Sequence, residues 1–351
     1  MTSWQKLLAD EQFKERLYKR SEIVQGIRTF FSANGFLEVE TPLLVAHPGT
    51  EPYLEVFETE LKVLDGRKKR AFLLTSPELA MKKLLVAGIP KLFQLCKSFR
   101  NGEGVSASHN HEFTILEWYR AGADYQDLMV DCERLLLSIT KLLNPGSNQM
   151  QLIYQQKKYD LTPPWERLSV AEAFEHYAQV PEAALHDRDQ MIEVAKNKGY
   201  SVGSDSTWEE AYNQVFLNAV EPKLGGTRPT FLYDYPVAQA ALSRKKTSDA
   251  RYAERFELYL AGLELANAFS ELTDWQEQYE RMESDLAERA TLGKTPYGID
   301  TDFIAALRKG MPDSAGIALG VDRLVMLCTD AASIHDVLLF PVSEAFSLDA
   351  D

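Results

Sequence analysis

The predicted strands of this sequence are joined by short turns and loops, not by helices at regular intervals. Residues 56–63 and 71–74 read as two strands around Asp65-Gly66, a dipeptide that favours a tight hairpin turn. Two more strand candidates, 91–99 and 112–119, are separated only by a polar loop. Parallel strands need long crossovers, usually helical. This order therefore predicts an α+β fold with a largely antiparallel sheet flanked by helices.

The rest of the chain supplies helices for the two faces of that sheet. Helices are predicted at 22–34, 78–87, 127–143, 208–220 and 277–292, and further strands at 36–41, 230–235, 255–261 and 316–319. Residues 144–229 are richer in helical patterns, so we expect a variable helical region there. The sequence contains neither a Walker A motif nor a strand-borne G-x-G-x-x-G, which disfavours the two commonest nucleotide-binding folds.

Composition narrows the class of protein. The 351 residues include 38 basic and 52 acidic side chains, a net charge of −14 that disfavours non-specific binding to nucleic acid. No apolar run reaches membrane-spanning length, and residues 1–20 have no signal-peptide pattern, so we expect a cytoplasmic protein without a membrane partner. The cysteines, Cys96, Cys132 and Cys328, are few and far apart, as is typical of a reducing compartment.

The first chemistry-bearing segment runs from Phe99 to Phe113. Arg100 lies at a strand end beside Gly102, where its fork can bind phosphate oxygens in a bidentate manner. Phe113 offers a ring on which a base can stack. An ordinary polar hairpin loop explains the same residues equally well when this segment is taken alone.

Two further segments lie near the C-terminus. Residues 316–320 alternate small and aliphatic residues, which leaves one strand face bare enough for a flat ligand or for tight packing, and Arg323 opens the helix that follows. Glu257, Glu264 and Glu271 recur every seven residues, a period that would form one face of a helix, but Gly262 and the aromatic and β-leaning residues around Phe256 favour two strands around a turn. Carboxylates in apolar surroundings are costly unless they hold cations; a solvated acidic stripe is the alternative.

Together these segments resemble the signature motifs of class II aminoacyl-tRNA synthetases. The helix at 22–34 with the strand ending at Pro42 is similar to the first, dimer-forming motif. Segments 75–84, 109–119 and 267–272 resemble the lysyl type. The likeness extends over 21–342 and is weak between 143 and 229. It implies a class II catalytic core over 21–351, preceded by an N-terminal extension at 1–20.

The first motif also implies a homodimer. We expect the strand that ends at Pro42 to be unpaired within one subunit. Without a partner subunit, the apolar helix face formed by Ile23, Ile27 and Phe30 would also be exposed to solvent. We therefore expect this helix and strand to form the subunit interface.

Within the lysyl group, the chain resembles stand-alone paralogues that attach a β-lysyl group to a lysine of elongation factor P. The residues before the first motif are too few for the OB-fold domain that grips the anticodon. Segments 84–88, 93–96, 264–267 and 316–320 carry the resemblance, and Ala318 stands where lysyl-tRNA synthetases usually have Gly. The alternatives are a truncated synthetase that acylates tRNA or a small molecule, and an inactive paralogue that serves as a binding module.

The resemblance implies an ATP-dependent ligase that adenylates lysine or (R)-β-lysine. Arg100 and Arg323 match catalytic arginines on the α- and γ-phosphates. Other nucleotide-site matches are Asn101, Glu103, His109, Asn110, Phe113, Glu264, Leu265 and Gly320. Glu257 and Glu264 match the acids that hold Mg²⁺, a hard cation that carboxylates suit. Gly102 is inserted before Glu103, which loosens the match for Glu103 and His109, and His111 replaces the family's usual Pro.

The amino-acid pocket is implied in the same way. Its matches are Ser76, Pro77, Glu78, Glu117, Tyr119, Asn267, Phe269, Glu271 and Ala318. A lysine-like substrate carries two ammonium groups, so several acids are needed. Glu271 or Glu117 is expected to meet the side-chain ammonium, and Glu78 the backbone amine. Ala268 replaces a usual Gly, and the choice between α-lysine and β-lysine stays open.

Overall fold

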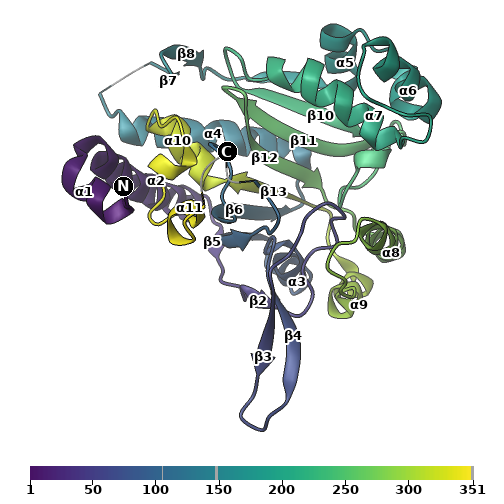
Figure 1. Cartoon of the computed structure of the whole chain (residues 1–351), viewed down its shortest axis with the longest axis horizontal. Coiled ribbons are helices and arrows are strands. Elements are labelled where there is room, and N and C mark those ends of the chain that lie inside the picture. The colour runs from purple at the N-terminus through teal and green to yellow at the C-terminus, as the bar shows by residue number, and fades with distance from the viewer. Residues whose placement is uncertain (105, 147–148, 349–351) are drawn as a thin grey trace.

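An eight-stranded sheet forms the centre of the computed structural model, which describes residues 1–104, 106–146 and 149–348 (Figure 1). In spatial order the strands are β1 (Leu37–Glu38), β5 (Lys91–Phe99), β6 (Glu112–Ala121), β13 (Ser314–Gly320), β12 (Leu263–Ser270), β11 (Tyr252–Leu260), β10 (Thr230–Pro236) and β9 (Glu166–Ser169). Neighbours pair antiparallel except at the edges, where β1–β5 and β10–β9 are parallel. The predicted α+β class with a largely antiparallel sheet is confirmed.

Helices cover both faces of the sheet. The first face packs against α2 (Glu11–Ala33), α4 (Tyr125–Leu143) and α10 (Val321–Cys328), and the second against α3 (Glu78–Val86), α8 (Trp275–Thr291) and α9 (Thr301–Gly310). Strand alternation separates the two sides. Leu116 and Trp118 of β6 enter the first core, whereas Tyr119 enters the second. The polar residues between them, such as Glu117, therefore face the second side.

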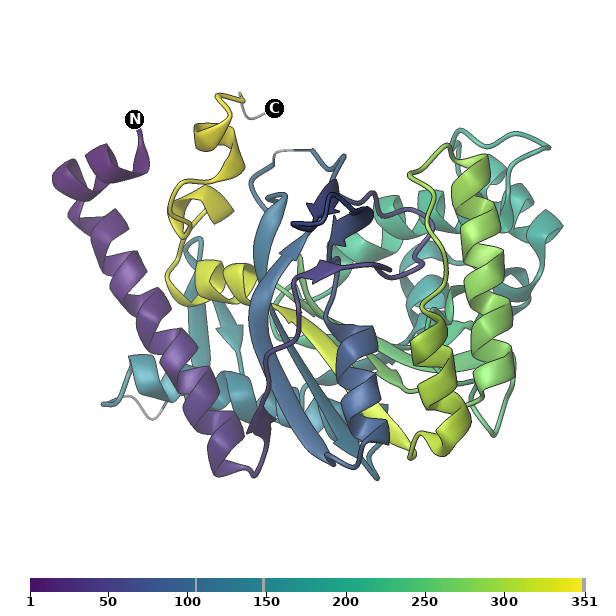
Figure 2. The same ribbon diagram turned by 90° about the horizontal axis from the view of Figure 1, so that it is seen from below.

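The long helix α2 buries its apolar stripe within its own chain. Figure 2 shows α2 as a long helix along one side of the molecule. Ile23, Ile27 and Phe31 are fully buried, and the Phe31 ring lies 4.8 Å from that of Phe93. The argument for a dimer from an exposed face at Ile23 and Ile27 is therefore wrong, because α4 and the sheet already cover it. The predicted strand at 36–41 shortens to β1, an edge strand that pairs only with β5.

The chain ends are tied to this core. Short α1 (Ser3–Ala9) precedes α2, and α11 (Val342–Ala345) lies near the C-terminus. The Ser3 hydroxyl donates to the Glu344 carboxylate at 2.5 Å. The expected boundary between residues 20 and 21 falls inside α2. No helix of the described residues is long and apolar enough to cross a bilayer.

Residues 144–229 build a helical cap with a small apolar core of its own. It contains α5 (Val170–Ala178), α6 (Arg188–Asn197) and α7 (Trp208–Val215), which pack beside β10. The helix predicted at 208–220 ends its α-helical part at Val215 and continues as a π-helical turn. This part of the chain also holds the hairpin β7 (Gln151–Tyr154) and β8 (Lys157–Asp160), together with β9, so its character is mixed.

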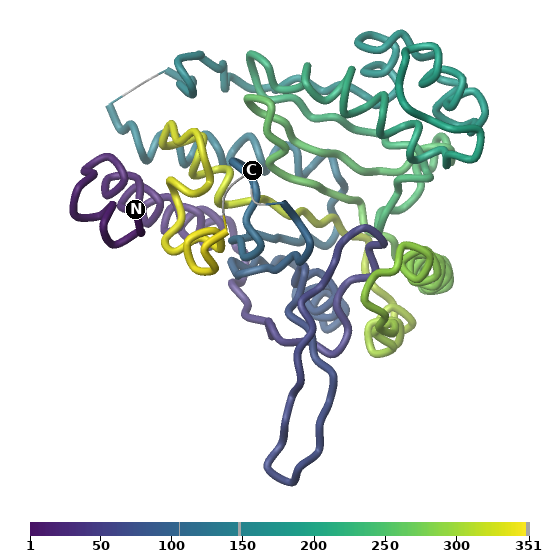
Figure 3. Tube along the Cα trace, viewed as in Figure 1, coloured from purple at the N-terminus to yellow at the C-terminus, as the bar shows by residue number. Residues whose placement is uncertain are grey.

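A second hairpin projects from the body at the predicted Asp65-Gly66 turn (Figure 3). It consists of β3 (Glu58–Lys62) and β4 (Lys68–Leu73), and β4 also pairs with β2 (Leu44–Val45). Arg70 contacts Glu58 through two hydrogen bonds of 2.6 and 2.8 Å, and Lys68 lies 3.1 Å from Glu60. These exposed pairs partly neutralise the basic cluster at 67–70, as in a solvated hairpin.

Candidate active site

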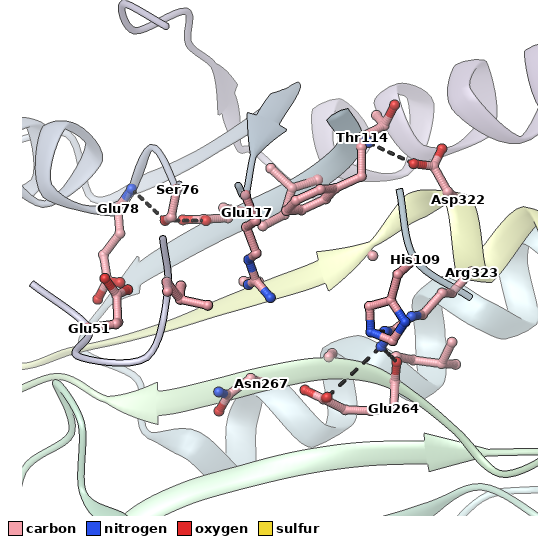
Figure 4. A pocket seen from close by; sticks show the side chains of 18 of the residues that line it. Glu51, Ser76, Glu78, His109, Thr114, Glu117, Glu264, Asn267, Asp322 and Arg323 are labelled. Atoms are coloured by element: carbon pink, nitrogen blue, oxygen red, sulfur yellow. Dashed lines mark hydrogen bonds and ion pairs between the residues drawn. The ribbon is translucent and has the colours of Figure 1, made fainter. Parts of the chain in front are cut away.

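A cavity of about 450 Å³ opens on the second face of the sheet (Figure 4). It lies over β6, β12 and β13 and extends to the start of α3 and of α10. Fifteen predicted site residues line it: Ser76, Glu78, Arg100, Glu103, His109, Asn110, Phe113, Glu117, Glu264, Leu265, Asn267, Phe269, Ala318, Gly320 and Arg323. Pro77, Asn101, Tyr119, Glu257 and Glu271 are not among its lining residues.

The floor of the cavity is set by strand register. Asn267 on β12 is opposite Ala318 on β13, and Ala318 is in turn opposite Glu117 on β6. Residues paired in this way share one face of a sheet. The Ala318 methyl group therefore lies between an amide and a carboxylate on the cavity floor.

Arg100 and Phe113 lie together at the basic end of the cavity. The Arg100 guanidinium lies 5.2 Å from the centre of the Phe113 ring and 3.7 Å from Glu103. Its buried Nε has no hydrogen-bond partner among the described residues. A buried donor without an acceptor is costly, so this end of the cavity is suited to an anion such as a phosphate.

Arg323 is held more firmly. Its Nη1 donates to the Glu264 carbonyl oxygen at 2.7 Å, and its Nη2 lies 2.9 Å from His109 Nε2. A guanidinium only donates, so this His109 nitrogen accepts and the ring is neutral. Burial, together with the charge of Arg323, lowers the pKa of His109.

Buried Asp322 fixes the helix start that carries Arg323. Its carboxylate lies 2.6 Å from Arg20 Nη1 and accepts a hydrogen bond of 2.8 Å from the Thr114 backbone N–H. α2, β6 and α10 are thereby tied together at the rim of the cavity. Asn110 also supports the rim, because its side chain donates to the Glu112 carbonyl and accepts from Val342.

The opposite end of the cavity is acidic. The Ser76 hydroxyl donates to Glu117 at 2.6 Å, and the Tyr119 hydroxyl donates to the same carboxylate at 2.9 Å. Burial and the nearby charge of Glu78 raise the pKa of Glu117 to about 8. Figure 4 shows Glu51 and Glu78 side by side at this end. An ammonium group placed here would ionise Glu117 and satisfy it.

Beneath these acids lies a buried ion pair that the sequence analysis did not anticipate. Lys82 is 1% exposed and contacts the carboxylates of both Glu78 and Glu271. Burial alone would lower the pKa of Lys82, but the two carboxylates outweigh it and raise that pKa. Glu271 is paired with Lys82 and does not line the cavity, whereas Glu51, Glu78 and Glu117 line its acidic end.

Gly316 makes room for this layer. A Cβ atom at that position would lie 2.2 Å from a ring carbon of Tyr119 and 2.3 Å from Glu271 Oε1. Contacts of that length do not occur between packed atoms, so the bare strand face inferred from the sequence here accommodates Tyr119 and Glu271. The ligand-facing part of the strand begins at Ala318.

The expected Mg²⁺ ligands form a two-carboxylate set. Both Glu257 oxygens are engaged, one by Arg255 at 2.6 Å and the other by the Tyr259 hydroxyl at 2.6 Å. Burial and the charge of Glu257 raise the pKa of Glu264 to about 7. The described residues contain no cluster of three or more potential metal ligands. Glu264 lines the first cavity and Glu257 does not, so Glu264 is the carboxylate that would hold a Mg²⁺ ion there.

Several cavity residues were not singled out from the sequence. Glu51 and Tyr53 belong to the loop between β2 and β3, and Arg255 connects Glu257 with Asn267, whose Oδ1 accepts from Arg255 Nε at 3.2 Å. The loop gave only a turn signal, since it contains Pro48, Gly49 and Pro52. Arg255 and Asn267 meet because β11 pairs with β12, and a local sequence motif does not reveal which strands pair.

The raised pKa of Glu117 predicts proton release on binding. At pH 7 a carboxyl group with a pKa of about 8 is mostly protonated, and the ammonium group of bound lysine should ionise it. We expect the observed binding enthalpy of lysine to depend on the ionisation enthalpy of the buffer, and this dependence to decrease in Glu117→Gln. Isothermal titration calorimetry at pH 7 measures it. Exposed Glu280→Gln is the matched control, and equal dependence in all three proteins would contradict the assignment.

Comparison with known proteins accounts for this arrangement. Residues 3–344 match the family described as tRNA synthetases class II (D, K and N). Similar curated proteins include the lysine–tRNA ligase of Listeria welshimeri, 39% identical over 335 residues that cover 95% of this chain and 65% of the relative. Those of Carboxydothermus hydrogenoformans and a Nostoc species are 40% and 37% identical, over 96% of this chain and over 67% and 58% of their own lengths.

The chain thus spans about two thirds, or less, of the length of these relatives. The family match over residues 3–344 includes the part of this chain that forms the sheet and the cavity. From the family match over residues 3–344, the chain belongs to the class II tRNA synthetases of the D, K and N group.

Proposed function

We propose that this protein activates a lysine-like amino acid as an aminoacyl-adenylate and transfers it to a lysine side chain of elongation factor P. Amino-acid activation is supported by one observation: a single cavity has a basic end and an acidic end. Arg100 and Arg323 line the end suited to a triphosphate, and Glu78 and Glu117 line the end suited to ammonium groups. Similar curated proteins, 39–40% identical over about 95% of this chain, are lysine–tRNA ligases.

The first step is an in-line displacement at phosphorus. A carboxylate oxygen of the amino acid attacks the α-phosphorus of ATP, and diphosphate leaves with the electrons of the broken P–O bond. Arg100 supplies unpaired N–H donors for charge that grows on the α-phosphate, and Arg323 holds the outer phosphates. Bound Mg²⁺, held beside Glu264, would neutralise phosphate charge. Asn267 and Ser76 orient the substrate between the two ends.

The acceptor is proposed from charge and from the resemblance to stand-alone paralogues. A net charge of −14 does not favour an RNA backbone. Ala318 adds a methyl group to the pocket floor, where it favours (R)-β-lysine by restricting the space beside the α-carbon. Acylation of tRNA is the second candidate, favoured by identities of 37–40% to lysine–tRNA ligases. The presence of both arginines and Glu264 in one cavity argues against an inactive binding module.

We further propose a cytoplasmic homodimer that uses the open edge of the sheet. β1 pairs only with β5, and Leu37 on this edge is 52% exposed. An unpaired edge is a ready template for strand addition. In such a dimer the apolar face of α2 would stay buried within its own subunit, and the edge of β1 would form the contact.

The function is tested by separating activation from transfer. ATP–diphosphate exchange is measured with α-lysine and with (R)-β-lysine, and elongation factor P and tRNA are then each offered as acceptors. The proposal expects exchange with a lysine and a mass increase of elongation factor P by one lysyl group. Acylation of tRNA without modification of the protein would establish the second candidate instead. Failure of exchange with both lysines would exclude a lysine-activating enzyme.

Arg100→Ala is predicted to abolish activation without unfolding the protein. Loss of a phosphate clamp raises the barrier by about 3 kcal/mol, or on the order of a hundredfold in rate. Exchange kinetics and a thermal melt measure the two properties. Arg67→Ala, at the exposed hairpin turn, is the control and should leave exchange unchanged. Near-normal exchange in Arg100→Ala would remove that arginine from the mechanism.

Ala318→Gly is predicted to shift the preference toward α-lysine. The methyl group lies between Asn267 and Glu117, and a single methyl changes discrimination by about 1–3 kcal/mol. Its removal gives room to an amine on the α-carbon and leaves the carboxylates in place. The measurement is kcat/KM for adenylation of both lysines by the parent and the variant. An unchanged ratio would place the selection elsewhere in the pocket.

A further inference from the structure

A second cavity of about 420 Å³ adjoins the first. We call it the acidic chamber. It lies between the 46–55 loop, α7, α8 and the outer strands, and shares wall residues with the first cavity, including Glu51, Glu78 and Glu264. Its carboxylates are Glu51, Glu78, Glu209, Glu221, Glu257, Glu264, Asp285 and Glu288.

Tyr53 bridges the two helices that border the chamber. Its hydroxyl lies 2.8 Å from a carboxylate oxygen of Glu209 on α7 and 2.6 Å from one of Glu288 on α8. A phenol carries one hydrogen and therefore satisfies only one of these acceptors. Asp285 lies one turn from Glu288 on α8, and its pKa is raised to about 6 by burial, with the charge of Glu288 adding to the rise. The group of acids thus has a surplus of acceptors.

The wall of the chamber is aromatic. Tyr212, Phe216, Tyr235 and Tyr259 all line it. Tyr212 is only 1% exposed, and its hydroxyl has no hydrogen-bond partner among the described residues. Aromatic faces attract alkylammonium groups, and an unpartnered phenol oxygen accepts a hydrogen bond from one. Acids together with aromatic rings are the surroundings that a desolvated ammonium group requires.

The basic side chains near the chamber do not neutralise all of its carboxylates. Among the described lining residues, Arg255 is the only basic one, and it is paired with Glu257 at 2.6 Å and stacked on the Tyr235 ring at 4.4 Å. Arg281 on α8 faces Asp285 from outside the lining but donates to Glu277 at 2.5 Å. The charge of Arg255 acts on Glu209, but among the described residues neither arginine forms an ion pair with Glu209 or Glu288.

The chamber opens where the two reactants meet. Its shared wall includes Glu78, at the amino-acid end of the first cavity, and Glu264, at the phosphate end. An acceptor entering through the chamber would therefore reach the bond between the aminoacyl carbonyl and AMP. We propose that the acidic chamber binds the alkylammonium side chain of the amine that accepts the activated aminoacyl group. This inference rests on the proposed function.

The transfer step balances with this placement. The acceptor nitrogen loses one proton to expose its electron pair and attacks the carbonyl carbon. A C–N bond forms, the C–O bond to AMP breaks, and AMP leaves with that electron pair. The nitrogen loses a second proton as the amide forms, and both protons pass to solvent. The chamber gathers the acceptor while it is charged and delivers it beside the carbonyl carbon.

The test compares a charged acceptor with an uncharged one. Nα-acetyl-lysine methylamide serves as the charged acceptor, and hydroxylamine, which is mostly uncharged at pH 7, traps the adenylate as a hydroxamate. Glu209→Gln and Glu288→Gln should each raise the half-saturating concentration of the lysine derivative at least tenfold. Exchange and hydroxamate formation should stay within twofold of the parent, because neither residue lines the first cavity. Glu280→Gln, an exposed change on α8, is the charge-matched control.

Equal use of the lysine derivative by parent and variants, with exchange intact, would overturn the chamber as an acceptor site while leaving activation established. Absence of exchange in the parent would instead refute the proposed function. Binding is also measured without turnover, by titrating cadaverine into each protein in a calorimeter. The parent should bind it more tightly than Glu209→Gln and Glu288→Gln, and equal affinity would overturn the inference. Thermal melts check that each variant is folded.

Discussion

One buried ammonium shared by two carboxylates organises the amino-acid end of this protein. Lys82 on α3 joins Glu78 on its own helix to Glu271 at the end of β12. Removing one partner of such a group typically costs about 3–5 kcal/mol, because the others stay buried and uncompensated. The single positive charge is already used by these two acids. Glu117, in the next layer, is left with only hydroxyl donors, and this deficit makes the cavity a receptor for a cation.

The central sheet determines where Glu117 and its neighbours lie in the cavity. Alternation along β6 sends Trp118 into the core and Glu117 into the cavity, and pairing with β13 and β12 brings Ala318 and Asn267 alongside. At the other end, Asp322 ties the start of α10 to α2 and β6, which fixes the position of Arg323 at the rim of the cavity. Rigid elements thus hold the basic end and the acidic end of the cavity apart.

Local motifs predicted much of this site because its residues lie close together in the sequence. Arg100, Phe113 and Arg323 lie in short sequence segments, so the local pattern pointed to them and the resemblance implied their roles; the structure brings all three to one cavity. The buried position of Lys82 was not predicted, because a lysine in a helical segment is expected to be exposed to solvent unless its spatial neighbours are known. From the sequence, the apolar face of α2 was assigned to a partner subunit. Helical periodicity predicts that such a face is covered, but it does not identify the element that covers it.

On the function proposed above, the two cavities would also sort the reactants by charge at each step of that reaction. Eight carboxylates around the chamber oppose entry of a triphosphate, whereas Arg100 and Arg323 attract it to the far end of the first cavity. A cationic amino acid is drawn the opposite way, toward Glu78 and Glu117. Once the adenylate has formed and diphosphate has left, negative charge at the phosphate end decreases while the acids of the chamber stay in place. Electrostatics therefore favours a second cation at that stage, so the same acidic surroundings that hold the first substrate also prepare the cleft for the acceptor amine.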